Sequence, residues 1–486
     1  MPDGFTPYMA WYYDNYDFII GANGAQKELF DSSSANYTAV GLCTGNGQID
    51  MDGNIIYSAV KYDGRGNVVL RGEWDFALQD FRYAVSTSYN FMNQPTSELH
   101  KYEQMVERAV MDTHSALFTT EYDDLGRITC RKVSVDGGQP VTLTADSYDR
   151  IGRLAAQRRG VDVTFGYDIR SHLTSISSTV YSEQSEYAPT GGSADVSPSF
   201  KYINASTDTW HGTPAGQSPV SINWRYSYDG LGRLAQSLSA DGLYGETCDI
   251  DLDANVCGIV RRYRGADVQN AVISFDESMP TEVHDVSSPY YGDGVGSFPA
   301  GDYLLSYDRK GRLEYDGTRR AKITYGIWGD LPRKISMSNK DYSRNNYTPD
   351  GTLRERTFVT HRIKVVTVVN SKGDTVTRQR KADIIASHRY FGPFERILTD
   401  SLDWRVHTPV GYYDIKRKKN YWYLTNRLGS VMAVVDGEGS VVQRTGIYPG
   451  GTPFVVDYTA AANDTVPNRN VIAPAADRLH AGNRWL

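Results

Sequence analysis

Apolar and polar residues alternate along much of this 486-residue chain. In the tract 224–228 aromatic residues occupy every second position, and the tract 362–365 alternates in the same way. Alternation with period two predicts a strand with one buried face and one solvated face. Three of the four residues in the tract 366–369 are valine, which is typical of a strand covered on both faces. These patterns predict an all-β fold.

A tract of the form Tyr-Asp-x-x-Gly-Arg-Leu/Ile recurs between such strands. Near-identical copies occupy Tyr122–Ile128, Tyr148–Leu154, Tyr228–Leu234 and Tyr307–Leu313, and looser copies occupy Tyr62–Val68, Tyr167–Leu173 and Tyr347–Leu353. Asp-x-x-Gly is turn chemistry, because Asp bonds the backbone two residues ahead and Gly adopts a positive φ without strain. Each copy therefore predicts a β-hairpin with Tyr and Leu on the packed face, and the array predicts one continuous repeat structure.

The structural residues of this prediction are the Tyr, Asp, Gly and Arg of the four best copies. They are Tyr122, Asp123, Gly126, Arg127, Tyr148, Asp149, Gly152, Arg153, Tyr228, Asp229, Gly232, Arg233, Tyr307, Asp308, Gly311 and Arg312. We expect the four glycines to occupy equivalent turn positions with φ above zero. Each Arg either pairs with a neighbouring acid or stays solvated. We favour solvation, because surface ion pairs contribute only about 0–1 kcal/mol.

Three tracts depart from the alternating pattern. Glu98–Asp112 places apolar residues at helical spacing, so helix and strand both remain open, and we favour the strand. Gln184–Pro219 is rich in Ser, Thr, Gly and Pro, and Met279–Gly301 contains PYYGDGVGSFPAG. Both of these compositions predict irregular loops.

Composition agrees with a β-rich array and excludes some partners. The chain has 35 Tyr and 45 Gly, which supply strands and turns, and only 22% charged residues. Its net charge of −7 argues against nucleic-acid binding, which requires basic surfaces. The cluster Lys416–Lys419 is interpreted as a solvated turn between strands. No apolar run is long enough for a membrane helix, and residues 1–5 do not resemble a signal peptide.

Candidate chemistry is sparse, so we expect no enzyme activity, no cofactor and no metal. Asp50–Asn54 is similar to a calcium loop but has its Gly at the wrong position and lacks the bidentate Glu. Asp249, Asp251 and Asp253 would share a strand face, where solvation is favoured over cation binding. Cys248 and Cys257 either face each other across a hairpin or are buried free thiols, and we favour free thiols. A glycosidase with paired carboxylates lacks any motif to support it.

The repeated tract resembles the rearrangement hotspot (Rhs) or YD-repeat family, in the form common among Bacteroidetes. Leu304–Ile335 is similar to the family's repeat unit. Tyr421–Pro453 is similar to the signature that opens the family's associated core, with Asn426 and Arg427 in place of the usual Asp-His. The residues that match this signature are Leu428, Gly429, Ser430, Asp436, Gly439, Tyr448 and Pro449.

The resemblance implies a fold and a domain organisation. It implies tandem hairpins that form a curved or spiralling antiparallel sheet, an Rhs-type shell that is incomplete at the C-terminus. The implied modules are a β-rich lead-in at 1–95, a YD-repeat array at 96–383 with loops near 184–219 and 279–301, and the truncated start of the core at 384–486. The family's self-cleavage site and toxin domain lie beyond this tract, so no residue inherits a protease or toxin role.

The functional expectation is a non-catalytic scaffold or shell, a fragment of a secreted or surface polypeptide. In such relatives the shell encloses or presents a C-terminal effector, so the expected partners are that effector or the missing core segment. The alternative is a surface adhesion module whose tyrosines bind glycans. Neither nucleic acid nor an integral membrane position is expected.

Overall fold

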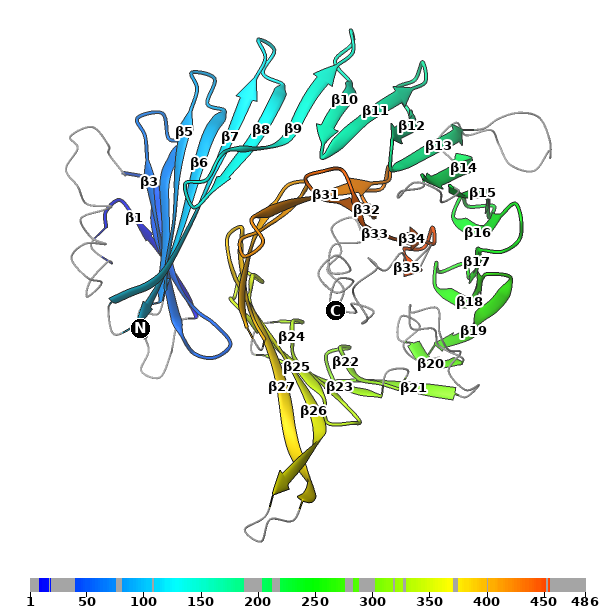
Figure 1. The fold of residues 1–486 in the computed structure, drawn as a ribbon. Coiled ribbons are helices and arrows are strands. Elements are labelled where there is room, and N and C mark those ends of the chain that lie inside the picture. The colour runs from blue at the N-terminus through cyan, green and yellow to red at the C-terminus, as the bar shows by residue number, and fades with distance from the viewer. Residues whose placement is uncertain are drawn as a thin grey trace. The chain divides into compact units, whose positions relative to one another are not determined.

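The computed structural model contains only β-strands among the residues it describes. These are residues 8–16, 18, 40–75, 81–106, 109–187, 203–211, 219–275, 283–287, 302–317, 320–326, 329–369, 375–399, 401–451 and 453–454. Most consecutive strands pair in antiparallel fashion, as the succession of hairpins in Figure 1 shows, and the last two strands form a separate two-stranded sheet. The predicted all-β fold of tandem hairpins is confirmed.

The chain forms two compact units, each built from two separate stretches of sequence. Unit 1 comprises Met1–Leu143 and Ala321–Lys418, and unit 2 comprises Thr144–Arg320 and Lys419–Leu486. The predicted modules have boundaries at 95/96 and 383/384, which differ from the boundaries of the two units, and these modules stay a prediction. The boundary at 383/384 lies within a strand of unit 1.

The strands of unit 1 form two meanders. The first contains β1 (Met9–Tyr13), β2 (Cys43–Ile49), β3 (Ile55–Tyr62), β4 (Val68–Asp75), β5 (Phe81–Tyr89), β6 (Pro95–Val106), β7 (Ala109–Tyr122) and β8 (Ile128–Val135). The second contains β23 (Ala321–Tyr325), β24 (Pro332–Met337), β25 (Tyr342–Tyr347), β26 (Leu353–Val369), β27 (Thr375–Phe391), β28 (Phe394–Leu398), β29 (Leu402–Thr408) and β30 (Gly411–Asp414).

An aromatic core joins the two meanders of unit 1. The ring of Tyr102 on β6 lies with its centroid 4.6 Å from that of Phe391 and 4.9 Å from that of Trp404. Polar bonds add to this contact, since Asp52 pairs with Arg333 at 2.9 Å and Glu73 with Arg354 at 2.7 Å. Residues distant in sequence thus make one core.

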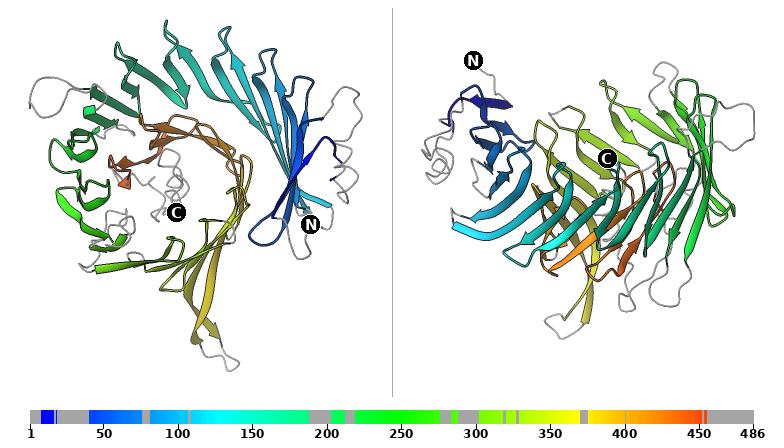
Figure 2. Two further views of the ribbon diagram at one scale, coloured as in Figure 1. Left: turned by 180° about the vertical axis from the view of Figure 1, so that it is seen from behind. Right: turned by 90° about the horizontal axis from the view of Figure 1, so that it is seen from above.

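The strands β26 and β27 are the longest in the described chain and extend beyond their neighbours. They pair with each other from Glu355↔Arg389 to Val369↔Thr375. The pairing of β25 with β26 reaches Val359, and that of β28 with β27 reaches Ser387. The distal part is therefore a ribbon that projects past both neighbours, as Figure 2 shows.

The first stretch of unit 2 is one long meander. It contains β9 (Val141–Tyr148, which begins before the division), β10 (Leu154–Arg159), β11 (Val161–Tyr167), β12 (Leu173–Ser178), β13 (Tyr181–Tyr187), β14 (Ile203–Trp210), β15 (Val220–Tyr228), β16 (Leu234–Ser239), β17 (Gly245–Ile250), β18 (Val256–Tyr263), β19 (Ala266–Phe275), β20 (Val283–Ser287), β21 (Asp302–Tyr307) and β22 (Leu313–Asp316). The second stretch contains β31 (Lys419–Thr425), β32 (Val431–Val435), β33 (Val441–Arg444), β34 (Gly446–Ile447) and β35 (Pro453–Phe454).

Two predicted loops contain strands, so those predictions were wrong in part. Within Gln184–Pro219, the end of β13 and all of β14 are paired strands, while 188–202 and 212–218 lie outside the described residues. The inward positions of β14 include Ser206, Asp208 and Trp210, so two of the three are polar and hydrophobic alternation is lost. Within Met279–Gly301, β20 is a strand and the other residues are not described.

The described residues of the ambiguous tract Glu98–Asp112 are strand, as we favoured, and residues 107–108 lie outside the description. The tract contributes to β6 and β7, which pair from Ser97↔Thr119 to Val106↔Ala109. Tyr102 points into the core and is only 2% exposed. The helical spacing in this tract did not produce a helix, because strand pairing on both sides of β6 satisfies its backbone.

Candidate functional site

Each Asp-x-x-Gly tract closes its hairpin with the same hydrogen bonds. At the turn Asp149–Arg153, Asp149 N donates to Arg153 O at 2.8 Å and Gly152 N donates to Asp149 O at 3.0 Å. The Asp149 carboxylate accepts from Ile151 N at 3.0 Å and Arg153 N at 2.9 Å. This is a type I turn followed by a left-handed residue that forms a bulge.

The other three best copies repeat this geometry. Their turns are Asp123–Arg127, Asp229–Arg233 and Asp308–Arg312, and the four glycines have φ of 77°, 89°, 77° and 75° in chain order. The predicted positive φ is therefore confirmed at Gly126, Gly152, Gly232 and Gly311.

The Arg of the motif pairs with the Asp of its own turn, so the favoured prediction of a solvated Arg was wrong. The Nε atoms of Arg127 and Arg153 both lie 2.7 Å from the Oδ2 of the Asp four residues earlier. Arg233 makes the same bond at 2.5 Å and Arg312 at 2.8 Å. The turn places the Asp Oδ2 next to the Arg, the fifth residue of the turn, so forming the ion pair requires little further loss of side-chain conformational freedom.

These contacts lower the pKa of the turn carboxylates. For Asp149 the largest cause that lowers the pKa is the backbone hydrogen bond from Arg153, with the Arg153 side chain adding to it. At Asp308 the side-chain bond from Arg312 is the largest cause and lowers the pKa to about 2. The turn Asp is a structural anion at neutral pH, and its accepting positions are already used.

The same turn occurs at five positions where the motif is degenerate. They are Asp50–Asn54, Asn90–Gln94, Asp251–Asn255, Asn426–Ser430 and Asp436–Ser440. In each, the first side chain accepts from the backbone N–H of residue five. Asn93 and Ala254 take the left-handed position of Gly, with φ of 62° and 70°. An Asp or Asn followed three residues later by Gly, Asn or Ala would have found them.

Several earlier interpretations change with this finding. Asp50–Asn54, weighed as a calcium loop, is one of these turns. Asp249 lies on β17 whereas Asp251 and Asp253 belong to a turn, so the predicted row on one strand face was wrong. Among the residues that the structure describes, no group of His, Cys, Asp or Glu is placed to hold a metal ion.

The cysteines and the basic cluster are also located. All four cysteines are free thiols of intermediate burial, and burial raises the pKa of Cys248 to about 11. Lys416–Lys419 is an exposed turn that runs into β31, as predicted, although Lys416 pairs with Asp403 at 2.8 Å and Arg417 with Asp414 at 2.7 Å.

The Tyr of the motif links one hairpin to the previous one. The Tyr122 hydroxyl donates to Pro95 O at 2.9 Å, and the Tyr228 hydroxyl donates to Ile203 O at 2.9 Å. Equivalent bonds to carbonyls 13 to 21 residues earlier are made by the hydroxyls of Tyr62, Tyr89, Tyr167 and Tyr187. Burial raises the pKa of five of these phenols, those of Tyr62, Tyr89, Tyr122, Tyr167 and Tyr187. Tyr is needed because Phe lacks this donor.

Neighbouring turns are also bonded to each other within a unit. Every second turn of an antiparallel meander lies at the same sheet edge, and the motif marks these turns. In unit 1, Gln94 Nε2 donates to Gly126 O at 2.8 Å. In unit 2, Arg153 donates to Asp168 O at 3.1 Å and Arg233 to Asp251 O at 2.7 Å. We call these bonds the turn ladder.

The residues that match the core signature form a segment that docks on the repeats of unit 2. We call residues 419–454 the docking segment. Trp210 Nε1 donates to Met432 O at 3.1 Å, Arg444 donates to His211 O at 2.7 Å, and the Tyr448 hydroxyl donates to Arg262 O at 2.9 Å. Leu428, Gly429 and Ser430 lie in its first turn, Asp436 and Gly439 in its second, and Tyr448 and Pro449 in its last.

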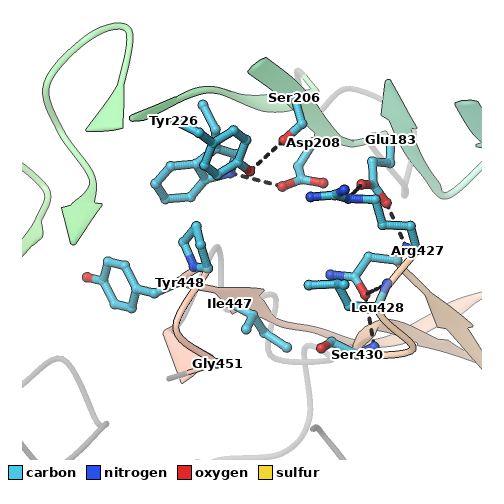
Figure 3. A pocket seen from close by; sticks show the side chains of 13 residues that line it. Glu183, Ser206, Asp208, Tyr226, Arg427, Leu428, Ser430, Ile447, Tyr448 and Gly451 are labelled. Carbon is cyan, nitrogen blue, oxygen red and sulfur yellow. Dashed lines mark hydrogen bonds and ion pairs between the residues drawn. The ribbon is translucent and has the colours of Figure 1, made fainter. Parts of the chain in front are cut away.

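A pocket with two carboxylates lies beneath the first turn of the docking segment. Figure 3 shows Arg427 reaching toward Glu183 on β13, beside Asp208 on β14. Glu183 accepts from Arg427 Nε at 2.9 Å and from Arg427 N at 2.9 Å. The cavity is about 40 Å³, which is room for a few water molecules.

Burial raises the pKa of the Asp208 carboxyl. Its carboxylate accepts from the Tyr181 hydroxyl at 2.6 Å and from Trp224 Nε1 at 2.9 Å. Burial first, and the charge of Glu183 second, raise the pKa of Asp208 to about 7. Sequence reasoning missed both acids, because Asp208 lies in the tract predicted to be a loop and Glu183 directly precedes it.

Comparison with known proteins identifies the fold. No family model and no curated protein matches the sequence. The crystal structure of TcdB2-TccC3 matches with a TM-score of 0.50 at 12% identity, over 89% of this chain and 26% of that chain. The form without its hypervariable C-terminal region gives 0.47 at 10% identity, over 89% and 25%. The Photorhabdus luminescens Tc holotoxin pore gives 0.42 at 10% identity, over 88% and 25%.

The chain therefore has a fold similar to part of TcdB2-TccC3, and it spans about a quarter of the length of that chain. In the part of the chain that the structure describes, no helix is long and apolar enough to cross a membrane.

Proposed function

We propose that this chain is a non-catalytic scaffold, a wall segment of an Rhs-type shell. The observation that carries the proposal is that the residues of the repeated motif form the hydrogen bonds that build each hairpin and join it to its neighbours. Tyr228 binds the previous hairpin, Asp229 and Gly232 build the turn, and Arg233 binds both its own turn and the next. Every polar residue of the motif serves to build and join hairpins, as in a scaffold.

The proposed role of the wall is to enclose or present an effector. Two observations support it: the motifs that resemble Rhs repeats, and a fold similar to part of TcdB2-TccC3. One related crystal structure is described as lacking a hypervariable C-terminal region, which indicates that the TcdB2-TccC3 protein has such a region. We extend this arrangement to our chain, with a C-terminal effector or a further core segment as partner and a secreted or surface location for the full-length protein.

The experiment is a protection assay on a complex. The chain is co-expressed with the polypeptide encoded next to it in its genome, purified, and treated with trypsin. We expect the two to co-purify and the partner to resist digestion. The matched control replaces Asp123, Asp149 and Asp229 with Ala, which removes the turn carboxylates and should expose the partner to cleavage.

Two results would overturn this proposal. One is a partner that is cut equally fast with and without the scaffold, combined with saturable binding of the chain to a glycan array, which would favour the adhesion alternative. The other is hydrolysis of a glycan or peptide by the purified chain that a single substitution abolishes.

A further inference from the structure

The contact between the first turn of the docking segment and β13–β14 contains an unbalanced set of charges. Two carboxylates, Glu183 and Asp208, face one guanidinium, that of Arg427. Glu183 and Asp208 are directly opposite in the strand register, and they are only 4% and 7% exposed. Arg427 spends both of its described bonds on Glu183.

Asp208 therefore depends on neutral donors. The groups that face it are Tyr181 and Glu183 from β13, Trp224 and Tyr226 from β15, and Arg427 from the docking segment. Tyr181 and Trp224 donate to it, and both are neutral. Burying an ionised carboxylate without its own cation is costly, so the site favours a protonated Asp208.

The docking segment covers this site. Asn426, Arg427, Leu428 and Ser430 from its first turn, with Ile447 and Tyr448 from its end, line the cavity opposite Asp208. Departure of the segment would open Asp208 to water and remove the cause of its altered titration. Docking and protonation are therefore linked.

We propose that this joint is a pH-dependent latch, in which protonation of Asp208 holds the docking segment on β13–β15 and ionisation loosens it. This inference does not rest on the proposed function, since it concerns the closure of the fold in any role.

The direction follows from the two states of Asp208. Its pKa is about 7 when docked and returns toward 3.8 when water reaches it. The docked form thus holds one more proton than the open form between these values. The extra stability of docking is complete at about pH 4 and is lost as pH rises to about 7. The opening equilibrium changes by up to about tenfold for each pH unit in this window.

Hydrogen exchange of the full chain, measured by mass spectrometry on peptides that cover Val431–Val435, tests the latch. Exchange rates of wild type and Asp208→Asn are compared at each pH from 4.5 to about 8, so that intrinsic pH effects cancel. We expect the wild-type rate to rise relative to the variant by about tenfold or more up to pH 7 and then to stay level. Peptides from β6 in unit 1 serve as the internal reference.

A second variant keeps the proposal testable if Asp208→Asn does not fold. Glu183→Gln retains an acceptor for Arg427 and removes the charge that raises the pKa of Asp208, so the transition should move to lower pH. A ratio of wild type to Asp208→Asn that is constant with pH would overturn the latch. So would a Glu183→Gln transition at the wild-type pH.

Discussion

Two aspartates of unit 2 show how location decides what the same side chain does. Asp149 lies at a sheet edge, binds the backbone of its own turn, and has a lowered pKa. Asp208 lies under the docking segment, binds side chains of neighbouring strands, and has a pKa raised to about 7. Both accept two or more hydrogen bonds. Their difference teaches that burial and a nearby like charge outweigh hydrogen bonds in setting the charge of a carboxylate.

The two locations also differ in how their structure is specified. The turn at Asp149 is built from five consecutive residues. The pocket at Asp208 needs Arg427, which lies 244 residues after Glu183. Changes in the packed joint should therefore cost more than changes in a single turn.

The largest effect is expected in the packed joint, from Trp210→Ala. Trp210 is 1% exposed and its Nε1 donates to Met432 O, which also accepts from Thr445 N, so truncation leaves a cavity and removes one of the two donors to this carbonyl. We expect a loss of about 3–5 kcal/mol in the free energy of unfolding, measured by denaturant titration. The control is Leu252→Ala at an exposed turn, 91% exposed, which should change little. Equal midpoints for both variants would contradict the comparison.

A smaller loss is expected at the turn itself, from Gly152→Val. A β-branched residue is strained at a φ of 89°, so the variant should lose about 1 kcal/mol or more in a denaturant titration. The matched change is Ala254→Gly, since Ala254 has a φ of 70° at the equivalent position. Relief of about 1–2 kcal/mol of strain exceeds the entropy cost of Gly, so this variant should be stabilised. The opposite sign in either variant would count against the shared turn geometry.

The bonds between hairpins are tested by Tyr228→Phe. Removing the hydroxyl leaves Ile203 O without its 2.9 Å donor, for an expected loss of about 1 kcal/mol in the free energy of unfolding. Tyr315→Phe is the control, because Tyr315 is 40% exposed. If both variants unfold at the wild-type denaturant concentration, the hairpin link has no energetic role.

The smallest effect is expected from the pH dependence of a turn carboxylate. The pKa of Asp308 is lowered to about 2 from an ordinary value of 3.8. Its stabilising contribution is therefore present above pH 4 and is lost as pH falls toward 2. In thermal melts, the melting temperature of wild type should exceed that of Asp308→Asn at pH 5, and this difference in melting temperature should close by pH 2. A gap that widens with acid would reverse the sign and refute the assignment.

The sequence by itself determined the local part of this protein. Asp-x-x-Gly sets a turn from neighbouring residues, so the hairpins, the positive φ at Gly126 and the β-class could be predicted. The pairing of Arg127 with Asp123 was misjudged, because general surface energetics was applied where the turn already orders both groups.

Only the tertiary structure decided the joint and its charges. β14 was predicted to be a loop because its tract is rich in Ser, Thr, Gly and Pro, and two of its inward positions, Ser206 and Asp208, are polar and give no apolar alternation to oppose that prediction. The approach of Arg427 to Glu183 follows from packing across hundreds of residues, which leaves no periodic signal in the chain. The charge of a buried group depends on the water excluded by distant segments, and that exclusion exists only once the chain has folded.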